Sequence, residues 1–153
     1  MELMTMKPAI APMSAGAIAN VVALEQQVLA CPQTQITTHH VLHGGLYSRT
    51  ILVPAGVVLT GALIKIPTLL FISGDVLVYV GEDQRIRITG TAVIPASAGR
   101  KQAFVAHQDT SISMVFPTNS TSVEQAEAEF TDDAALLFSR RDADLNFEII
   151  TGE

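Results

Sequence analysis

Residues 51–80 decide the fold of this chain, and they read ILVPAGVVLT GALIKIPTLL FISGDVLVYV. Val, Ile, Leu and Thr fill short segments in this stretch, and Gly or Pro separates one segment from the next. Short aliphatic runs between such breakers are typical of β-strands. The same pattern extends over residues 34–117, with turn signals about ten residues apart. We therefore predict an all-β fold, an antiparallel sandwich or barrel.

The expected strands cover residues 35–42, 46–53, 57–66, 69–72, 76–80, 85–88, 92–94, 102–107 and 111–116. Turns are expected between them, among others at Ser73-Gly74-Asp75 and Thr89-Gly90-Thr91, because these residue types favour turns. Residues 69–72 show no alternation of apolar and polar side chains. This predicts a strand that is covered on both faces.

A helix is expected to precede the strands. Residues 1–13 resemble an irregular arm, Ser14 is a good N-cap, and apolar residues recur at helical spacing until about residue 30, just before Pro32. Glu25 interrupts the apolar face. Two arrangements fit this pattern: the helix packs on its own domain, or the arm and helix are swapped onto a neighbouring subunit.

Two short helices and a tail are expected after the last strand. Thr121 or Ser122 can cap the first helix, and Thr131 opens the second, with acidic residues in its first turn. Residues 142–153 are expected to form a tail. Its apolar residues alternate well enough to pair as an edge strand, on this chain or on a neighbour: Leu145, Phe147, Ile149 and Ile150.

The composition of the chain calls for extensive burial. It has 153 residues, of which 48% are hydrophobic and 16% charged, against about 25% charged in an ordinary soluble domain. Gly, Pro, Lys65 and Asp75 interrupt the apolar stretch, so no window of about 18 apolar residues could span a membrane. The apolar surface must be folded inward or covered by a partner, which favours a homo-oligomer, a dimer or trimer.

The charge is distributed unevenly. Residues 1–123 carry seven Lys or Arg against six Asp or Glu, whereas residues 124–153 carry two Arg against nine acids. The acidic block is interpreted as a solvated helix and tail, with a docking surface for a basic partner as the alternative. A nucleic-acid binder would need the opposite sign. The lone Cys31 allows no intramolecular disulfide and is compatible with a reducing compartment, so secretion is not expected.

Several motifs point to a known group of proteins. They include Tyr47-Ser48-Arg49, Pro54-Ala55-Gly56, Ser73-Gly74-Asp75, Gly99-Arg100-Lys101 and His107-Gln108-Asp109. In this order and spacing they resemble small cupin-like proteins that are encoded by tailed bacteriophages and prophages. The resemblance spans roughly residues 38–129. It implies a cupin-type β-barrel, which is a small jelly roll, and a phage or prophage source.

The resemblance also implies a test of metal binding, since metal-binding cupins use three His and one carboxylate inside the barrel. Counting along the cupin pattern places the ligand positions at Ala62, Ile64, Thr68 or Leu69, and Gln102. None of these side chains is a His, Cys or carboxylate, which are the usual ligands of such ions. We therefore expect a barrel with no metal cofactor and without the chemistry that such a metal supports.

The histidines are the remaining candidates for a metal or catalytic site. On one strand, His39 and His43 point to one face and His40 to the other. His39 and His43 would form a site if His107 or Asp109 folded beside them, but histidines next to a Gly-Gly turn also make ordinary surface or interface hydrogen bonds. His107 and Asp109 could act as an acid/base pair, or Asp109 could simply form a turn.

Tyr47 and Arg49 share one strand face and are candidates for holding a small anionic ligand. The alternative is a packed Tyr47 with a bonded hydroxyl and an Arg49 paired with an acid. The sequence has no Gly-x-Ser-x-Gly elbow, no Walker loop and no dinucleotide fingerprint. It therefore gives no support to triad hydrolysis or nucleotide binding.

These observations predict an arm and helix over residues 1–33, a cupin-like barrel over 34–117, and acidic helices and a tail over 118–153. The expected function is that of a non-catalytic phage structural or interaction protein. A virion component of the head-decoration type, which binds itself and the capsid protein, is the most concrete version. The alternatives are a cupin-type enzyme or sugar-binding protein with an atypical His site, and an accessory protein that binds a host factor. The expected location is the virion or the cytoplasm of the infected bacterium.

Overall fold

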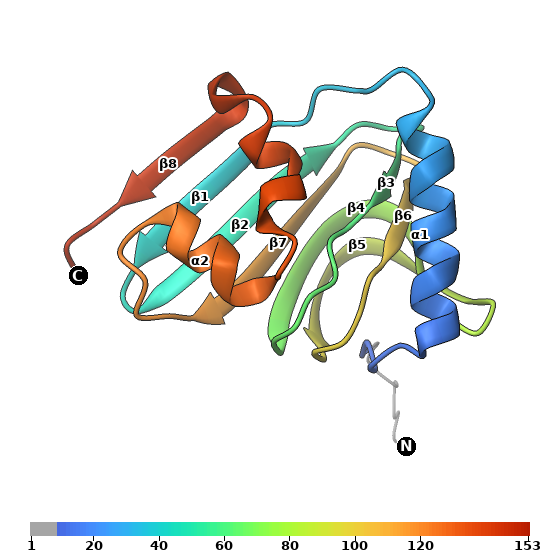
Figure 1. Ribbon diagram of the computed structural model, residues 1–153, viewed down its shortest axis with the longest axis horizontal. Helices are drawn as coiled ribbons and strands as arrows, with labels where there is room; N and C mark the ends of the chain where they lie inside the picture. The colour runs from blue at the N-terminus through green and yellow to red at the C-terminus, as the bar shows by residue number, and fades with distance from the viewer. Residues whose placement is uncertain (1–8) are drawn as a thin grey trace.

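The computed structural model describes residues 9–153, so the first eight residues of the expected arm lie outside the described part. The chain forms helix α1 (Ala15–Leu29), then a series of strands, helix α2 (Val123–Phe130), three 3-10 turns and a last strand (Figure 1). The strands are β1 (Thr38–His43), β2 (Leu46–Val53), β3 (Val58–Thr60), β4 (Thr68–Gly81), β5 (Gln84–Ala96), β6 (Ala103–Ala106), β7 (Thr110–Pro117) and β8 (Asn146–Ile150). The all-β class with an N-terminal helix is confirmed.

The strands form one sheet that curls into a half-barrel. Its order is β3-β6-β4-β7-β2-β1-β8, and β5 pairs with the other edge of β4. The first part of β4 pairs with β7, whereas its second part pairs with β6. The long β4–β5 hairpin therefore belongs to both halves of the curled sheet, and Figure 1 shows its strong curvature.

The two turns predicted inside this hairpin are wrong. Ser73-Gly74-Asp75 and Thr89-Gly90-Thr91 are continuous strand, and Gly74 lies directly opposite Gly90 at the bend between the halves. Gly74 has φ +147°, and a Cβ atom there would lie 2.4 Å from Thr110 Oγ1. A side chain at this position would collide with the crossing strand, so glycine is needed for the bend.

Two other predictions for this region also differ from the structure. Leu69 and Phe71 are exposed while Leu70 and Ile72 are buried, so this part of β4 is covered on one face only. The strand predicted for residues 57–66 is limited to β3, because the chain then leaves the sheet. Past this point Lys65 N–H donates to Phe130 O, and Ile64 makes only an isolated bridge to Arg100.

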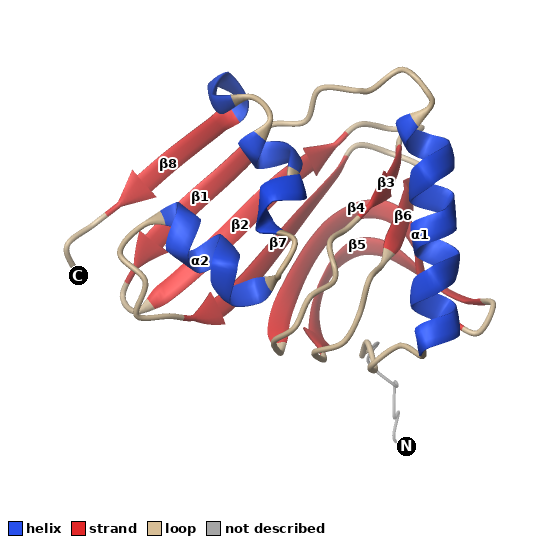
Figure 2. Cartoon of the chain, in the orientation of Figure 1, coloured by secondary structure: helices blue, strands red, loops and turns tan. Residues whose placement is uncertain are grey.

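Helix α1 covers the outer face of the half formed by β3, β6 and the second part of β4 (Figures 1 and 2). Ser14 Oγ accepts the Ala17 N–H, which confirms the predicted N-cap. Ala17 and Val21 are buried against Ala103. Glu25, which interrupts the apolar face, accepts hydrogen bonds from Lys101 Nζ (3.0 Å) and Thr60 Oγ1 (2.9 Å). The helix thus packs on the sheet of its own chain.

The first part of the C-terminal segment, residues 118–145, covers the inner face of the other half, and the whole segment runs from 118 to 153 (Figure 1). Helix α2 is capped by Ser122, whose Oγ accepts the Gln125 N–H, as predicted. After Thr131 the chain forms short 3-10 helices, Ala134–Leu136, Phe138–Arg140 and Ala143–Leu145, where the sequence predicted a second short helix. The predicted tail pairs as strand β8, parallel to β1 of the same chain.

A single large core fills the half-barrel and extends beneath α2. Its fully buried members include Tyr47, Ile72, Ile94, Phe116 and Phe130. Helix α2 therefore closes the open side of the curled sheet with its own apolar side chains. In residues 9–153, no helix is both long and apolar enough to span a membrane.

Candidate functional site

The four positions at which the sequence resemblance places the metal ligands of a cupin are buried or pack against the core, and buried Arg100 contacts one of them. Ala62 and Ile64 pack against the core cluster, and the Thr68 and Gln102 side chains are buried. Arg100 is only 1% exposed, and its Nη2 donates to Thr68 Oγ1 at 2.7 Å. One of the four positions predicted for metal ligands is thus hydrogen-bonded to a cation.

Backbone oxygens and a sulfur atom complete the surroundings of Arg100. Nη1 donates to Ser97 O (2.7 Å) and to Ala96 O (3.3 Å), and Met114 Sδ lies 3.8 Å from Nη2. Nε is buried and has no hydrogen-bond partner among residues 9–153. Burial lowers the pKa of Arg100 to about 10, which still leaves the guanidinium charged at neutral pH. The residues present do not fit a divalent metal ion, because a fixed positive charge stands among them.

A second polar cluster joins β2 to the C-terminal segment. Arg49 Nη1 donates to Glu127 Oε2 at 2.9 Å, and Arg49 Nη2 donates to Ser139 Oγ at 3.0 Å. Arg140 Nε reaches the other Glu127 oxygen at 2.8 Å. The Arg49 guanidinium also lies 5.5 Å from the ring centre of Phe130. Burial raises the pKa of Glu127, but the bonds from Ser139, Arg140 and Arg49 outweigh it and lower the pKa overall.

His40 and Tyr47 extend this cluster toward β8. His40 Nδ1 lies 2.7 Å from the Tyr47 hydroxyl, and His40 Nε2 lies 2.8 Å from Asn146 Oδ1. Asn146 Nδ2 donates to Ser139 O, so Oδ1 faces His40 as an acceptor. His40 Nε2 therefore carries a proton, and the neutral ring accepts at Nδ1 from Tyr47. Burial lowers the pKa of His40 and raises the pKa of Tyr47 to about 12.

Tyr47 and Arg49 thus lie on one strand face, as predicted. Both are buried, Tyr47 under Phe130 and Arg49 under Glu127 and Phe138. The Tyr47 hydroxyl is bonded and Arg49 is paired with an acid, which is the packed alternative considered above. This arrangement fixes the C-terminal segment onto the sheet.

The structure does not bring the other candidate residues together. The His39 ring stacks on Phe147 with ring centres 5.0 Å apart, and His43 Nδ1 is bonded to Thr151 Oγ1 at 2.8 Å. His107 lies in the β6–β7 loop, where its backbone N–H donates to the backbone oxygen of Asp75. Asp109 Oδ1 accepts the Ala55 N–H at 2.9 Å. In the described part of the chain, no three His, Cys, Asp or Glu residues could hold a metal ion together.

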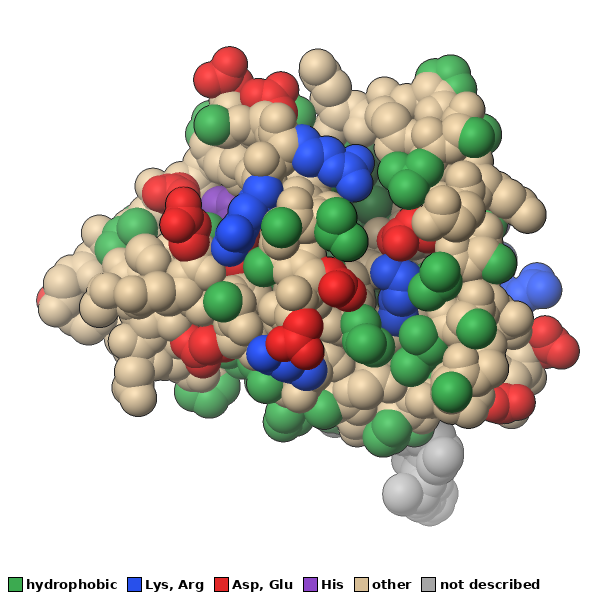
Figure 3. All heavy atoms as spheres, viewed as in Figure 1, with side chains coloured by type: hydrophobic (Ala, Val, Ile, Leu, Met, Phe, Trp, Pro, Cys, Tyr) green, Lys and Arg blue, Asp and Glu red, His purple; other side chains and the backbone are tan. Residues whose placement is uncertain are grey.

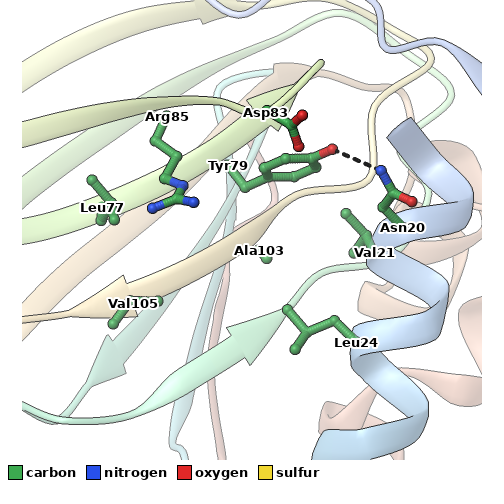
Figure 4. Close-up of a pocket in the computed structure, with 9 residues that line it drawn as sticks. All are labelled: Asn20, Val21, Leu24, Leu77, Tyr79, Asp83, Arg85, Ala103 and Val105. Carbon is green, nitrogen blue, oxygen red and sulfur yellow. Dashed lines mark hydrogen bonds between the residues drawn. The ribbon is translucent and has the colours of Figure 1, made fainter. Parts of the chain in front are cut away.

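A groove that the sequence did not reveal lies between α1 and the sheet (Figure 4). Its volume is about 500 Å³, and the lining residues are Asn20, Val21, Leu24, Leu77, Tyr79, Asp83, Arg85, Ala103 and Val105. The Tyr79 hydroxyl accepts from Asn20 Nδ2 at 3.3 Å, and Arg85 and Asp83 stand at the hairpin side. Side chains alternate along β4, so Leu77 and Tyr79 lie on the face opposite to that of buried Val76 and Val78. The sequence could predict this outer face, but it could not predict that α1 packs on it.

No protein-family model and no curated protein matches this sequence. Similar solved structures include a cupin superfamily protein from Desulfitobacterium hafniense, with 13% identity and a TM-score of 0.46 over 58% of this chain and 83% of that chain. KdgF from Halomonas sp. shows 16% identity and a TM-score of 0.47 over 59% and 86%. Ectoine synthase from P. lautus shows 18% identity and a TM-score of 0.49 over 65% and 75%.

Proposed function

We propose that this protein is a non-catalytic structural or interaction protein whose barrel interior serves only as core. The observation that carries the proposal is buried Arg100, whose guanidinium donates to Thr68; the sequence resemblance places a metal ligand at Thr68. A guanidinium repels a divalent ion, and the neighbouring Ala62 and Ile64 offer no donor atom. Function is then carried by the exterior of the molecule.

Metal analysis tests the non-catalytic part of this proposal. The protein would be produced in media supplemented in turn with iron, manganese, nickel and zinc, and its bound metal measured after gel filtration. We expect no stoichiometric metal. Stoichiometric metal that disappears in His107→Ala would overturn the proposal in favour of a cupin-type enzyme or sugar-binding protein with an atypical His site.

We further propose that the protein acts in a phage particle, as a component that binds the capsid protein. This part is supported by the sequence resemblance described above. Mass spectrometry of purified particles from an induced host is the decisive experiment, with the host lysate as reference. Enrichment in the particle supports a virion role. Presence in the lysate with absence from the particle favours an accessory protein that binds a host factor in the bacterial cytoplasm.

The groove beside α1 favours a second candidate function, the binding of a small molecule. Its volume of about 500 Å³ is within the usual range of ligand sites, and its floor is apolar. Arg85, for which the structure gives no acidic partner within residues 9–153, would hold an anionic group. An anilinonaphthalene sulfonate dye is a suitable probe. Weaker dye fluorescence in Arg85→Gln than in Arg141→Gln supports the candidate, and equal fluorescence excludes it.

A further inference from the structure

One face of the sheet has no cover in the described part of the chain. Helix α2 and the 3-10 turns lie over the inner face of β1, β2 and β7, and α1 lies over the outer face of the other half (Figure 1). The outer face of β8, β1, β2, β7, the first part of β4 and the second part of β5 remains open. We call this surface the outer face, and the strand register below defines its side chains.

The register aligns large apolar side chains across these strands. Phe147 on β8 pairs with His39 on β1, and Phe71 on β4 pairs with Val93 on β5. Between these two pairs, Ser113 on β7 pairs with Thr50 on β2 and with Phe71 on β4. Large apolar side chains on this face are 40% to 62% exposed: Leu52, Leu69, Phe71, Val93, Phe147 and Ile149. Scattered exposed apolar residues are common, but six large ones on one uncovered sheet face indicate an interaction surface.

The outer face carries no fixed charge. Within these described strands, the positions that alternate outward contain no Asp, Glu, Lys or Arg, although the whole chain has a net charge of −6. The opposite side differs, because Lys, Arg, Asp and Glu side chains are spread over the C-terminal segment in Figure 3. An uncharged face offers no attraction to a basic or acidic partner, which leaves an equally uncharged surface as the fitting partner.

Four of the hydroxyl groups of this face are hydrogen-bonded to one another in two pairs. Thr50 Oγ1 and Ser113 Oγ are 2.6 Å apart across β2 and β7, and Ser73 Oγ and Thr91 Oγ1 are 3.2 Å apart across β4 and β5. Covering the face leaves these four hydroxyl groups with their partners, which lowers the desolvation cost. A dry, flat partner surface suits such a face better than a hydrated one.

The exposed area is close to what a stable dimer buries. About half of each of the six large apolar side chains is exposed, which at roughly 200 Å² per side chain amounts to about 600 Å². The intervening Ser, Thr, Val and Pro side chains add to this area. Stable interfaces bury about 800 Å² on each partner.

We propose that the outer face binds the outer face of a second copy of this chain, sheet against sheet, about a two-fold axis. Two sheets pack in this way about 10 Å apart, and a two-fold contact needs a surface that is complementary to itself. Helix α2 and the 3-10 turns, with their acidic side chains, then lie on the outside of the dimer. This inference rests on the proposed interaction function and names its first partner.

The test is the mass of the full-length protein in solution, measured by light scattering and sedimentation equilibrium over a range of concentrations. We expect a dimer for the wild type and a dissociation constant raised about a hundredfold or more in Phe71→Lys, because a charge would be buried at the contact. Val93→Lys is a second variant on the neighbouring strand. Leu136→Lys is the control, since Leu136 is 69% exposed on the C-terminal segment, away from the outer face.

A wild type that stays monomeric at all concentrations, or a Leu136→Lys variant that dissociates as much as the other two, would overturn the inference. Circular dichroism of each variant establishes that it is folded. The outcome is separable from that of the proposed function. A metal-free monomer ends only the dimer inference, whereas a dimer that is absent from particles ends only the virion role.

Discussion

Gly74 is the residue on which the bend of the β4–β5 hairpin depends. A Cβ atom there would lie 2.7 Å from Thr110 Cα, which is backbone and cannot rotate away. We expect Gly74→Ala to lower the free energy of unfolding by about 3 kcal/mol or more, from overpacking and backbone strain together. Gly90→Ala is the matched control, because Gly90 also has a positive φ but free space around it, so about 1 kcal/mol is expected. Urea denaturation measures both, and equal losses would contradict the collision.

His40 makes the stability of the fold depend on pH. Burial lowers its pKa below 6.5, whereas in the unfolded chain it titrates near about 6.5. As the pH falls below that value, His40 binds a proton in the unfolded state but not in the folded state, so the free energy of unfolding decreases. We expect a shallower decrease between about pH 7 and 5 in His40→Gln than in the wild type. His39→Gln, at the exposed neighbouring position, should keep the wild-type slope, and a shared slope for all three proteins would refute this role of His40.

Helix α1 contacts the sheet through one face only. Of its two adjacent valines, one lies on that buried face and the other faces solvent. Val21 is 1% exposed, and Val22 is 42% exposed. We expect Val21→Asp to cost about 3 kcal/mol or more, because a carboxylate would be forced against Ala103 without a partner. Val22→Asp should cost no more than about 0.5 kcal/mol. Hydrogen exchange of the α1 amides is the measurement, and equal loss of protection in both variants would show that the contact does not hold the helix.

The elements that follow from local patterns were predictable from the sequence. Alternation of Ile112, Met114 and Phe116 predicted β7 closely, and the Ser14 and Ser122 caps were found from residue type and position. The bend at Gly74 was not predictable from the sequence, because a glycine between two apolar runs is equally consistent with a turn and with a bent strand. The pairing of strand β8 was also beyond prediction. Alternation indicated an edge strand there, but it could not identify β1 as the parallel partner.

The candidate site was predictable only in part. Period-two spacing placed Tyr47 and Arg49 on one face, but their partners are far away in sequence, with Glu127 78 residues beyond Arg49. The burial of Arg100 was not predictable, because an Arg beside a Gly is normally a surface turn residue. Its interior position depends on the Thr68 hydroxyl and on backbone oxygens that only the folded barrel brings together.

At the scale of the whole molecule, the C-terminal segment acts as a structural part of the barrel. It covers Tyr47 and Phe116 and supplies the partners of Arg49 and His40. We expect a chain that ends at residue 117 to lose its cooperative thermal transition, since large apolar and charged groups would be uncovered together. A chain that lacks only residues 151–153, which are exposed, should keep its transition. Circular dichroism during heating compares the two, and a cooperative transition in the shorter chain would show that the sheet folds alone.

The hydrogen bonds between β1 or β2 and the C-terminal segment have a consequence for the order in which the chain folds during synthesis. Strands β1 and β2 leave the ribosome early, yet His40 meets Asn146 across 106 residues and Arg49 meets Ser139 across 90. Until residues 139–146 emerge, both side chains lack these partners and stay hydrated, so the polar cluster on the inner face of these strands cannot form. Final closure of the barrel therefore requires residues 139–146, and until they emerge the nascent chain exposes an incomplete, apolar sheet.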